Sequence, residues 1–387
     1  MKKGNFFVPL VVCAILLGGC VISTNPPVAD TLPSPTVALP PLPTTSPSPT
    51  LQSSSSNPSF PTTSIPVTWA DLDLAGKLVY ITFSLQDNNP ILDIEVLDLS
   101  TGGVTILFQA PSNSWIFSVV VSPDFRQLVM TYSPPLENNA LGIKALYTMP
   151  LDGSASPQLL FTPPTKDDQY FEPQFSPDGK YLYFVHVNYQ LPRQTPDQHY
   201  PVFFEIYRMA YPNGQLEKIV DNAYWPRISA DSSRLVYVSD NLDDGTNKLM
   251  LANTDGSNAQ EVPMTGPVIP SIIDAPLFSP DGGSILFSAV APVQSFTPNW
   301  LDRLLGVQVA SAHSLPEDWW SVPTAGGVPT QLTHLQASSL NASLAPDRQL
   351  LASFSGKGIF VMGLDGSGLT TIVSDVGGIP GTVNWIP

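Results

Sequence analysis

One turn motif recurs along the chain at nearly regular intervals. Its fullest form is "FSPDGKYLYFV" at Phe175–Val185, a turn signal followed by an apolar run, and looser copies include "VSPDFRQLVMTY" and "LDLAGKLVYITF". With the Ser of the motif as a phase marker, the repeats fall at Asp73, Ser122, Ser176, Ser229, Ser279, Ala345 and Ile386. The intervals are 49, 54, 53, 50, 66 and 41 residues. Spacings of this size are typical of the four-stranded blades of a β-propeller.

Each repeat carries the pattern of four strands. A short strand leads into the turn, and the next strand is apolar at successive positions, as expected where neighbouring sheets cover both of its faces. A third strand has an aliphatic and aromatic core, as in "EIYRMA" and "DWWSVP", and a tight turn such as "LDGS" leads to a shorter fourth strand. The sequence therefore predicts an all-β fold over residues 67–387, a six-bladed β-propeller of four-stranded antiparallel blades.

The aspartates of the motif are interpreted as turn formers and not as catalytic groups. Pro presets φ for a turn, Asp bonds its own nearby backbone, and Gly takes the left-handed conformation without steric cost. Phe125 and Arg348 stand where Gly is expected. Those two turns must be strained or of another type.

The end of the chain predicts how the ring closes. "VNWIP" matches the segment before the motif, so Val383–Ile386 would form the innermost strand of blade one, with the rest of that blade coming from the N-terminal side. Closing the ring removes exposed sheet edges. "VTWADLDL" at Val67 competes for the same position, and the sequence leaves both alternatives open.

The combination of "FSPDGK-x-L-x-F" with a downstream "IY-x-M" and "DG" turn resembles the TolB-type β-propeller repeat. The resemblance covers residues 70–387. It implies the fold, and because relatives include both periplasmic scaffolds and the propeller halves of some peptidases, it implies no particular activity.

The N-terminal segment is predicted to direct export. A basic "MKK" start and an apolar run over Phe6–Leu17 form a secretory signal core that is too short for a permanent membrane span. It ends in "LLGGC", which resembles the bacterial lipobox, so residues 1–19 are a lipoprotein signal peptide and Cys20 is the lipidation site; an ordinary cleaved signal is the alternative. Residues 21–66 contain 12 Pro and 18 Ser or Thr. The range 20–66 is therefore predicted to be the lipidated cysteine and a disordered tether.

Charge and cysteine content exclude several classes of function. Without Lys2 and Lys3 the chain has 14 basic and 32 acidic residues, a poor balance for binding nucleic acid. The other cysteine, Cys13, lies in the signal core, so the exported body has neither a thiol nor a disulfide. The four histidines have no metal-ligand spacing, and "SDNLDDG" lacks an oxygen ligand at Leu242 for a calcium loop. We expect no metal, no cofactor and no catalytic constellation.

Candidate binding residues lie in long loops on one face of the ring. The turns between first and second and between third and fourth strands are tight, whereas length variation concentrates on the opposite face, above all in the insertion 291–317 of blade five. Residues 299–312 have near-helical apolar spacing, and packing onto blades five and six is the alternative to a ligand contact. The candidate ligand-binding residues are Trp300, Arg303 and His313 from the insertion and Tyr189, Arg193, His199 and Tyr200 from the blade-three loop.

Two functional hypotheses follow. The favoured one is a monomeric cell-envelope lipoprotein, held on the periplasmic face or the outer surface of a membrane by its lipid, that binds a protein or a glycan through the loop-decorated face. The alternative is a propeller hydrolase or lyase with a polar site at the channel mouth. Clustering of His, Arg and carboxylates at that mouth would favour the enzyme.

The lipobox interpretation gives the first prediction. Cys20→Ala should leave the protein as an unprocessed precursor or release it from the membrane, because no other residue can carry the lipid. Membrane fractionation and mass measurement of the N-terminus check this. A variant that fractionates and is acylated like the parent contradicts the assignment.

Overall fold

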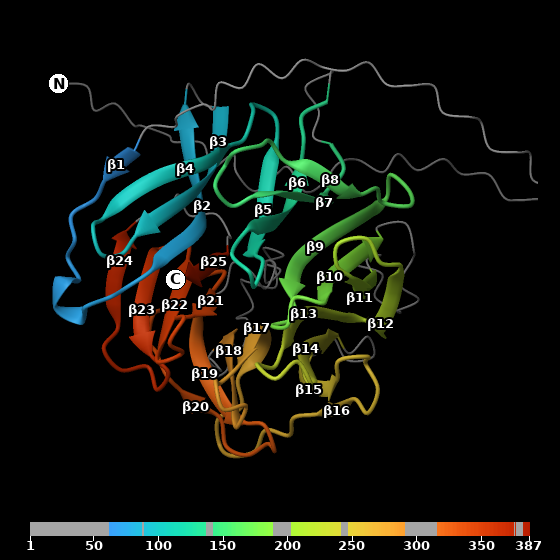
Figure 1. Cartoon of the computed structure of the whole chain (residues 1–387). Helices are drawn as coiled ribbons and strands as arrows, with labels where there is room; N and C mark the ends of the chain where they lie inside the picture. Colours follow the sequence, from blue (N-terminus) through green and yellow to red (C-terminus); the bar gives the residue numbers. More distant parts are fainter. Residues whose placement is uncertain are drawn as a thin grey trace, which may run out of the picture. The chain divides into compact units, whose positions relative to one another are not determined.

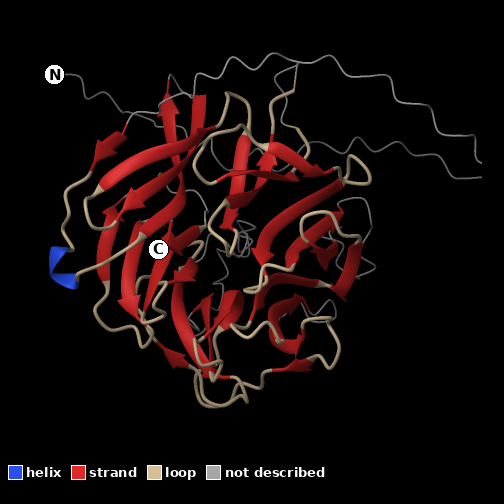
Figure 2. Ribbon diagram, in the orientation of Figure 1, coloured by secondary structure: helices blue, strands red, loops and turns tan. Residues whose placement is uncertain are grey.

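The computed structural model describes residues 62–86, 89–136, 142–188, 203–240, 247–290, 316–374, 376 and 382–387. They form six β-sheets arranged as blades around a central channel (Figure 1, Figure 2). Besides the single-turn 3-10 helix η1 (Ala70–Leu72), every element in these ranges is a strand. The predicted all-β, six-bladed propeller is confirmed.

All strand pairs within the blades are antiparallel. From the channel outward, blade one consists of β25 (Val383–Ile386), β2 (Lys77–Gln86), β3 (Asn89–Asp98), β4 (Gly103–Gln109) and β1 (Thr62–Ser64). Blade two consists of β5 (Trp115–Val121), β6 (Gln127–Ser133), β7 (Ala145–Pro150) and β8 (Gln158–Phe161). Blade three consists of β9 (Asp168–Phe175), β10 (Tyr181–Asn188), β11 (Phe203–Ala210) and β12 (Leu216–Asp221).

The remaining three blades repeat this order. Blade four consists of β13 (Ala223–Ile228), β14 (Arg234–Asp240), β15 (Asn247–Asn253) and β16 (Gln260–Glu261). Blade five consists of β17 (Ser271–Phe278), β18 (Ser284–Val290), β19 (Glu317–Pro323) and β20 (Thr330–Gln331). Blade six consists of β21 (Asn341–Leu344), β22 (Leu350–Ser355), β23 (Gly358–Gly363) and β24 (Thr370–Ser374).

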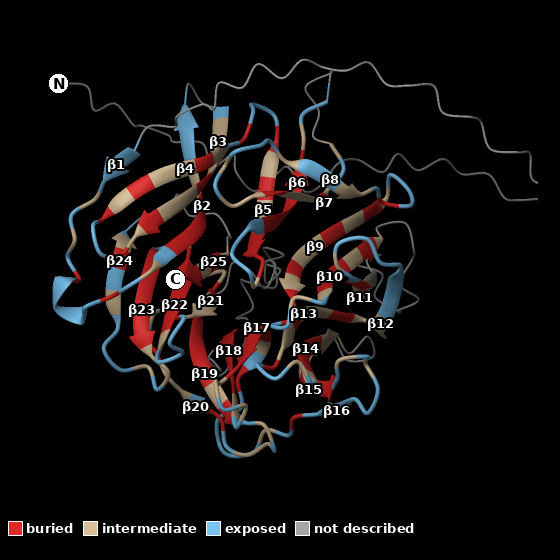
Figure 3. Ribbon diagram, in the orientation of Figure 1, coloured by how far each residue is buried: buried red, intermediate tan, exposed pale blue. Residues whose placement is uncertain are grey.

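The hydrophobic core lies between the blades. One cluster joins β14 and β15 of blade four to β17, β18 and β19 of blade five, and another joins blades one and two. Six consecutive residues of β6, from Leu128 to Ser133, are buried. Figure 3 shows this burial along the inner strands, while the outer strands are more exposed. The runs of apolar residues in the sequence thus mark strands that are covered on both faces, as expected.

The recurrent motif closes the turn between the first two strands of a blade. The serine hydroxyl donates to the aspartate two positions later, at 2.7 Å in the Ser176–Asp178 pair, and the aspartate also accepts a backbone N–H. Gly179 has φ +71°, and Phe125 and Arg348 take the same left-handed conformation at φ 57° and 61°. The aspartates are therefore turn formers. Ser232 also stands at the Gly position and has φ 59°, so three non-glycine turns are strained, at a cost of about 1–2 kcal/mol each.

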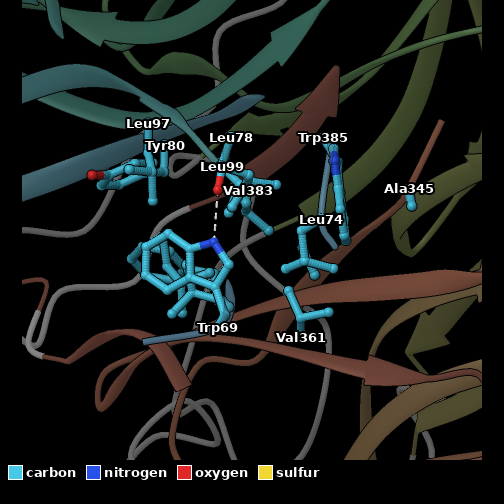
Figure 4. Packing of buried hydrophobic residues seen from close by; sticks show 14 of the residues in the cluster. Trp69, Leu74, Leu78, Tyr80, Leu97, Leu99, Ala345, Val361, Val383 and Trp385 are labelled. Atoms are coloured by element: carbon cyan, nitrogen blue, oxygen red, sulfur yellow. Dashed lines mark hydrogen bonds between the residues drawn. The ribbon is translucent and has the colours of Figure 1, made fainter. Parts of the chain in front are cut away.

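The N-terminal segment does not supply the inner strand of blade one. β1 pairs with β4 at the outer edge of the blade, inside the range that the sequence assigned to the tether. Trp69 of "VTWADLDL" lies in the core between blades one and six, and its indole N–H donates to the carbonyl of Leu99 at 2.7 Å (Figure 4). The N-terminal segment therefore packs at the outer side of blade one. The alternative in which "VTWADLDL" supplies the innermost strand of this blade is wrong.

The C-terminal strand β25 closes the ring, as the sequence predicted. It pairs with β2 from Lys77↔Ile386 to Tyr80↔Val383. Its side chains also reach the next blade, because the Thr382 hydroxyl accepts from the Val119 N–H at 2.8 Å and the Asn384 Oδ1 accepts from the Val121 N–H at 3.1 Å.

On the other side of β25, the Trp385 N–H donates to the Ser343 hydroxyl of blade six at 3.0 Å. The Trp385 indole donates to the Ala75 carbonyl at 2.9 Å. Residues 382–386 therefore hold blades one, two and six together.

Removal of residues 379–387 should make the body insoluble or strongly destabilised. The truncation deletes the buried Trp385, and loss of a buried aromatic side chain typically costs about 3–5 kcal/mol, out of about 5–15 kcal/mol for a whole domain. Urea unfolding of the chain from residue 57, with and without this segment, measures the effect. A chain lacking only the exposed Pro387 is the control. Equal urea midpoints for the full and the truncated body would contradict closure by β25.

Candidate ligand-binding site

The binding residues predicted from the loops lie outside the described residues. These are Trp300, Arg303, His313, Tyr189, Arg193, His199 and Tyr200, and the lipidation site Cys20 also lies outside. Their roles stay predictions. The candidate site that the structure describes is a different one, inside the central channel.

Residues from all six inner strands line a cavity in this channel. The position two residues before the phase marker of each repeat faces the cavity, whose volume is about 340 Å³. The six residues at this position, here called the channel ring, are Val120, Gln174, Arg227, Leu277, Ser343 and Asn384. The rim consists of residues from the tight turns, including Phe125, Pro177, Pro280, Pro346 and Arg348. The cavity therefore opens on the face with short turns, opposite to the face that the loop lengths favoured.

Two further cavity residues are positioned by irregular backbone. Glu172 of β9 and Trp225 of β13 both stand four residues before the phase marker, and both have positive φ, 50° and 55°. Strand pairing shifts register at each of these points, which marks a β-bulge. Backbone strain of this kind costs about 1–3 kcal/mol per residue and concentrates at functional sites.

Trp225 connects two carboxyl groups from neighbouring blades. Its backbone N–H donates to Glu172 Oε2 at 3.0 Å, and its indole N–H donates to Asp274 Oδ1 at 2.9 Å. Asp274 is buried on β17 and does not line the cavity. The inner strands of blades three, four and five are thereby linked around one side of the channel.

The electrostatics of the cavity depend on Glu172 and Arg227. Burial raises the pKa of Glu172 to about 7, against the opposing effects of the Arg227 charge and the Trp225 N–H. Burial also lowers the pKa of Arg227, while Glu172 raises it. A guanidinium remains charged at neutral pH even so. Near pH 7 the cavity thus holds a full positive charge beside a carboxyl group that is only partly ionised.

Arg227 has unused hydrogen-bonding capacity. One guanidinium N–H donates to the carbonyl of Pro226 at 2.9 Å, and the guanidinium carbon lies 5.5 Å from the centre of the Trp225 ring. Among the described residues no carboxylate oxygen lies within 4.0 Å of it. Because a guanidinium has five N–H donors, an anionic group entering the cavity would find several of them available.

A second buried carboxyl group lies at the base of the blade-five insertion. Glu317, the first residue of β19, is 1% exposed, and its carboxylate lies near the Ser288 hydroxyl and the Leu340 backbone N–H without a hydrogen bond of ordinary geometry to either. Burial raises its pKa to about 7, and its charge contributes to raising the pKa of Asp274 after burial itself. Glu317 does not line the cavity. Its charge acts on Asp274, whose carboxylate accepts from the Trp225 indole at the site.

Sequence reasoning missed Glu172, Trp225 and Arg227. The signal that could have found Arg227 is the comparison of repeats, because the position two residues before the phase marker differs from blade to blade while the next position stays apolar. Glu172 and Trp225 have no such signal, because a β-bulge turns them toward the cavity. The lining contains two Arg, one ionisable carboxylate and no His. Within the described ranges, no three His, Cys, Asp or Glu side chains are grouped to hold a metal ion. No helix in those ranges has the length and hydrophobicity that crossing a membrane requires.

Comparison with known proteins supports the fold. No family model matches the sequence, and no curated protein matches it significantly. Among solved structures, TolB from Acinetobacter baumannii is similar at a TM-score of 0.56 and 17% identity, over 81% of this chain and 67% of that one. A structure from a nidogen/laminin complex is similar at a TM-score of 0.54 and 11% identity, over 80% and 98%. A putative TolB from Agrobacterium tumefaciens aligns at a TM-score of 0.47 and 15% identity, over 81% and 100%. At such identities the likeness concerns architecture alone, and this chain has the fold of a TolB-type six-bladed β-propeller.

Proposed function

We propose that this protein is a binding scaffold that engages a protein or an envelope polymer through the central channel of its propeller. The observation that carries the proposal is the channel ring. Its six residues occupy equivalent positions in six similar repeats, yet they include aliphatic, amide, hydroxyl and guanidinium side chains. The next residue in each repeat, by contrast, is always apolar. When the packing positions of a repeat stay apolar and the cavity positions differ from blade to blade, the cavity is suited to binding a ligand that has no rotational symmetry.

The proposed cellular context comes from the N-terminal sequence. We propose that the protein is exported and lipidated at Cys20, and that the part of the predicted tether that precedes β1, residues 21–61, holds a monomeric propeller away from the membrane surface. The long loops that sequence analysis favoured for binding would lie at the other end of the channel. A ligand larger than the cavity could extend outward past the rim, with its recognised group in the channel ring.

One observation favours the alternative, a propeller hydrolase or lyase. Glu172 lines the cavity, and its pKa of about 7 suits a general acid or base at neutral pH. The two functions differ in what happens to the captured ligand. A scaffold releases it unchanged, whereas an enzyme with Glu172 in this role converts it and loses the conversion in Glu172→Gln.

Filling the cavity tests the proposed function. Gln174→Trp places a large side chain in the channel ring, and the matched Gln158→Trp places the same side chain on the exposed outer strand β8. Both variants and the parent are immobilised and exposed to detergent-solubilised envelopes of the source organism, and retained material is identified by mass spectrometry. We expect Gln174→Trp to lose the retained partner by tenfold or more, as expected when a central contact worth about 2 kcal/mol is blocked, and Gln158→Trp to keep it.

The urea midpoints of the two variants serve as the folding control. Equal retention by the parent and by a folded Gln174→Trp would contradict a channel site. Mass spectrometry of the ligand after incubation decides between scaffold and enzyme, because only an enzyme changes its mass or structure.

A further inference from the structure

We propose that the channel binds the C-terminal end of a peptide, with Arg227 donating hydrogen bonds to the terminal carboxylate. This rests on the proposed function, since it specifies the ligand of the same cavity. The ligand class follows from three features of the described residues: the charge inside the cavity, the depth of that charge, and the chemistry of the walls.

The charge inside the cavity is positive in a strongly acidic protein. The whole chain has a formal net charge of −16, yet the two charged side chains of the lining other than Glu172 are arginines, Arg227 and Arg348. A planar guanidinium with unused N–H donors matches a carboxylate, which it can bind with two parallel hydrogen bonds. The indole of Trp225, whose own N–H is occupied by Asp274, supports the guanidinium from its ring face.

The depth of Arg227 restricts which part of a ligand can carry the anion. Arg227 lies on the inner strand two residues before the phase marker, whereas the rim is formed by turn residues such as Phe125 and Pro177. A carboxylate that reaches Arg227 must pass the rim before the rest of its molecule. It therefore lies at the end of the ligand and not along its length.

The walls favour a peptide over a sugar acid as the source of that carboxylate. At the level of Arg227 in the channel ring, the cavity is also lined by Val120 and Leu277, which suit an aliphatic side chain next to the carboxylate. Gln174 is half-buried, and its amide makes one long hydrogen bond of 3.3 Å, so it can exchange that bond for one to a peptide group. Phe125 at the rim is 46% exposed and held at positive φ, where its ring can pack on the preceding residue of the peptide.

The ionisation state of Glu172 changes how strongly Arg227 can bind an incoming carboxylate. When ionised, this carboxylate attracts the guanidinium and repels an incoming anion, and when protonated it does neither. Asp274 and Tyr224 are the other titratable groups that interact with it besides Arg227. Replacement of Glu172 by Gln removes the competing charge while keeping the side-chain shape.

The test uses the full chain and three probes of defined chemistry. These are N-acetyl-Ala-Ala-Leu with a free carboxylate, the same tripeptide as the C-terminal amide, and D-glucuronate as a carboxylate without a peptide. Ligand-observed NMR titration gives their dissociation constants. We expect the peptide acid to bind about tenfold or more tightly than the amide, the ratio for a charge-assisted hydrogen bond, and more tightly than glucuronate.

Variants assign this preference to Arg227. Arg227→Gln should reduce the ratio of acid to amide affinity to near one, and Arg227→Lys should retain part of it, because the charge remains and the two-pronged geometry is lost. Arg126→Gln, an exposed arginine outside the cavity, makes the same change in net charge and should leave the ratio unchanged. At about pH 8, where Glu172 is mostly ionised, Glu172→Gln should strengthen binding of the acid severalfold and leave the amide unaffected.

The results that overturn the inference are distinct from failure of the proposed function. Equal affinity of acid and amide overturns the carboxylate assignment, and leaves the channel as a binding site. Glucuronate binding as tightly as the peptide acid overturns the peptide assignment. Absence of binding by all three probes at millimolar concentration overturns the inference as a whole, while retention by Gln174→Trp decides separately whether the channel is used at all.

Discussion

The pairing of β25 with β2 is the interaction on which the rest of the structure depends. The first and last blades of a propeller have to be joined to close the ring. The inner strands of blades three, four and five are linked by the hydrogen bonds of Trp225, and β25 makes the corresponding links for blades one, two and six. Thr382 and Asn384 attach the closing strand to the backbone of β5, and Trp385 attaches it to blades one and six. Without these contacts, blades one and six would expose their shared core, which includes Trp69 and Leu78.

The same contacts shape the candidate site. Ser343 and Asn384 belong to the channel ring and also make hydrogen bonds of the closure, so part of the cavity wall is fixed by the strand that holds the ring together. On the opposite side, Glu172, Trp225 and Arg227 stand on bulged strands that are linked by Trp225. Ser343 and Asn384, which are fixed by the ring closure, thus lie across the cavity from the ionisable residues on the bulged strands. This arrangement is suited to holding a polar group in a defined place.

Sequence reasoning succeeded where local chemistry and period determine the structure. The Ser176–Asp178 turn repeats because its side chains satisfy its own backbone, and the phase of the repeat favoured Val383–Ile386 as the inner strand of blade one, with "VTWADLDL" left open as the alternative. Sequence reasoning failed where contacts between residues far apart in the sequence determine the structure. Trp69 is not part of a strand, and its indole N–H donates a hydrogen bond to the carbonyl of Leu99, thirty residues away in the sequence. The bulges at Glu172 and Trp225 change which side chains face the channel, and a positive φ at a glutamate or a tryptophan has no signature in the sequence.

Residue-resolved hydrogen exchange on the full chain tests closure by β25 most directly. The Val119 and Val121 N–H groups bond side chains of β25, so both should exchange as slowly as the core of β6. Thr382→Val should accelerate exchange at Val119 by about fivefold, as expected for loss of a bond worth about 1 kcal/mol, with a smaller effect at Val121. Rapid exchange of both amides in the parent, or unchanged exchange at Val119 in Thr382→Val, would contradict the account.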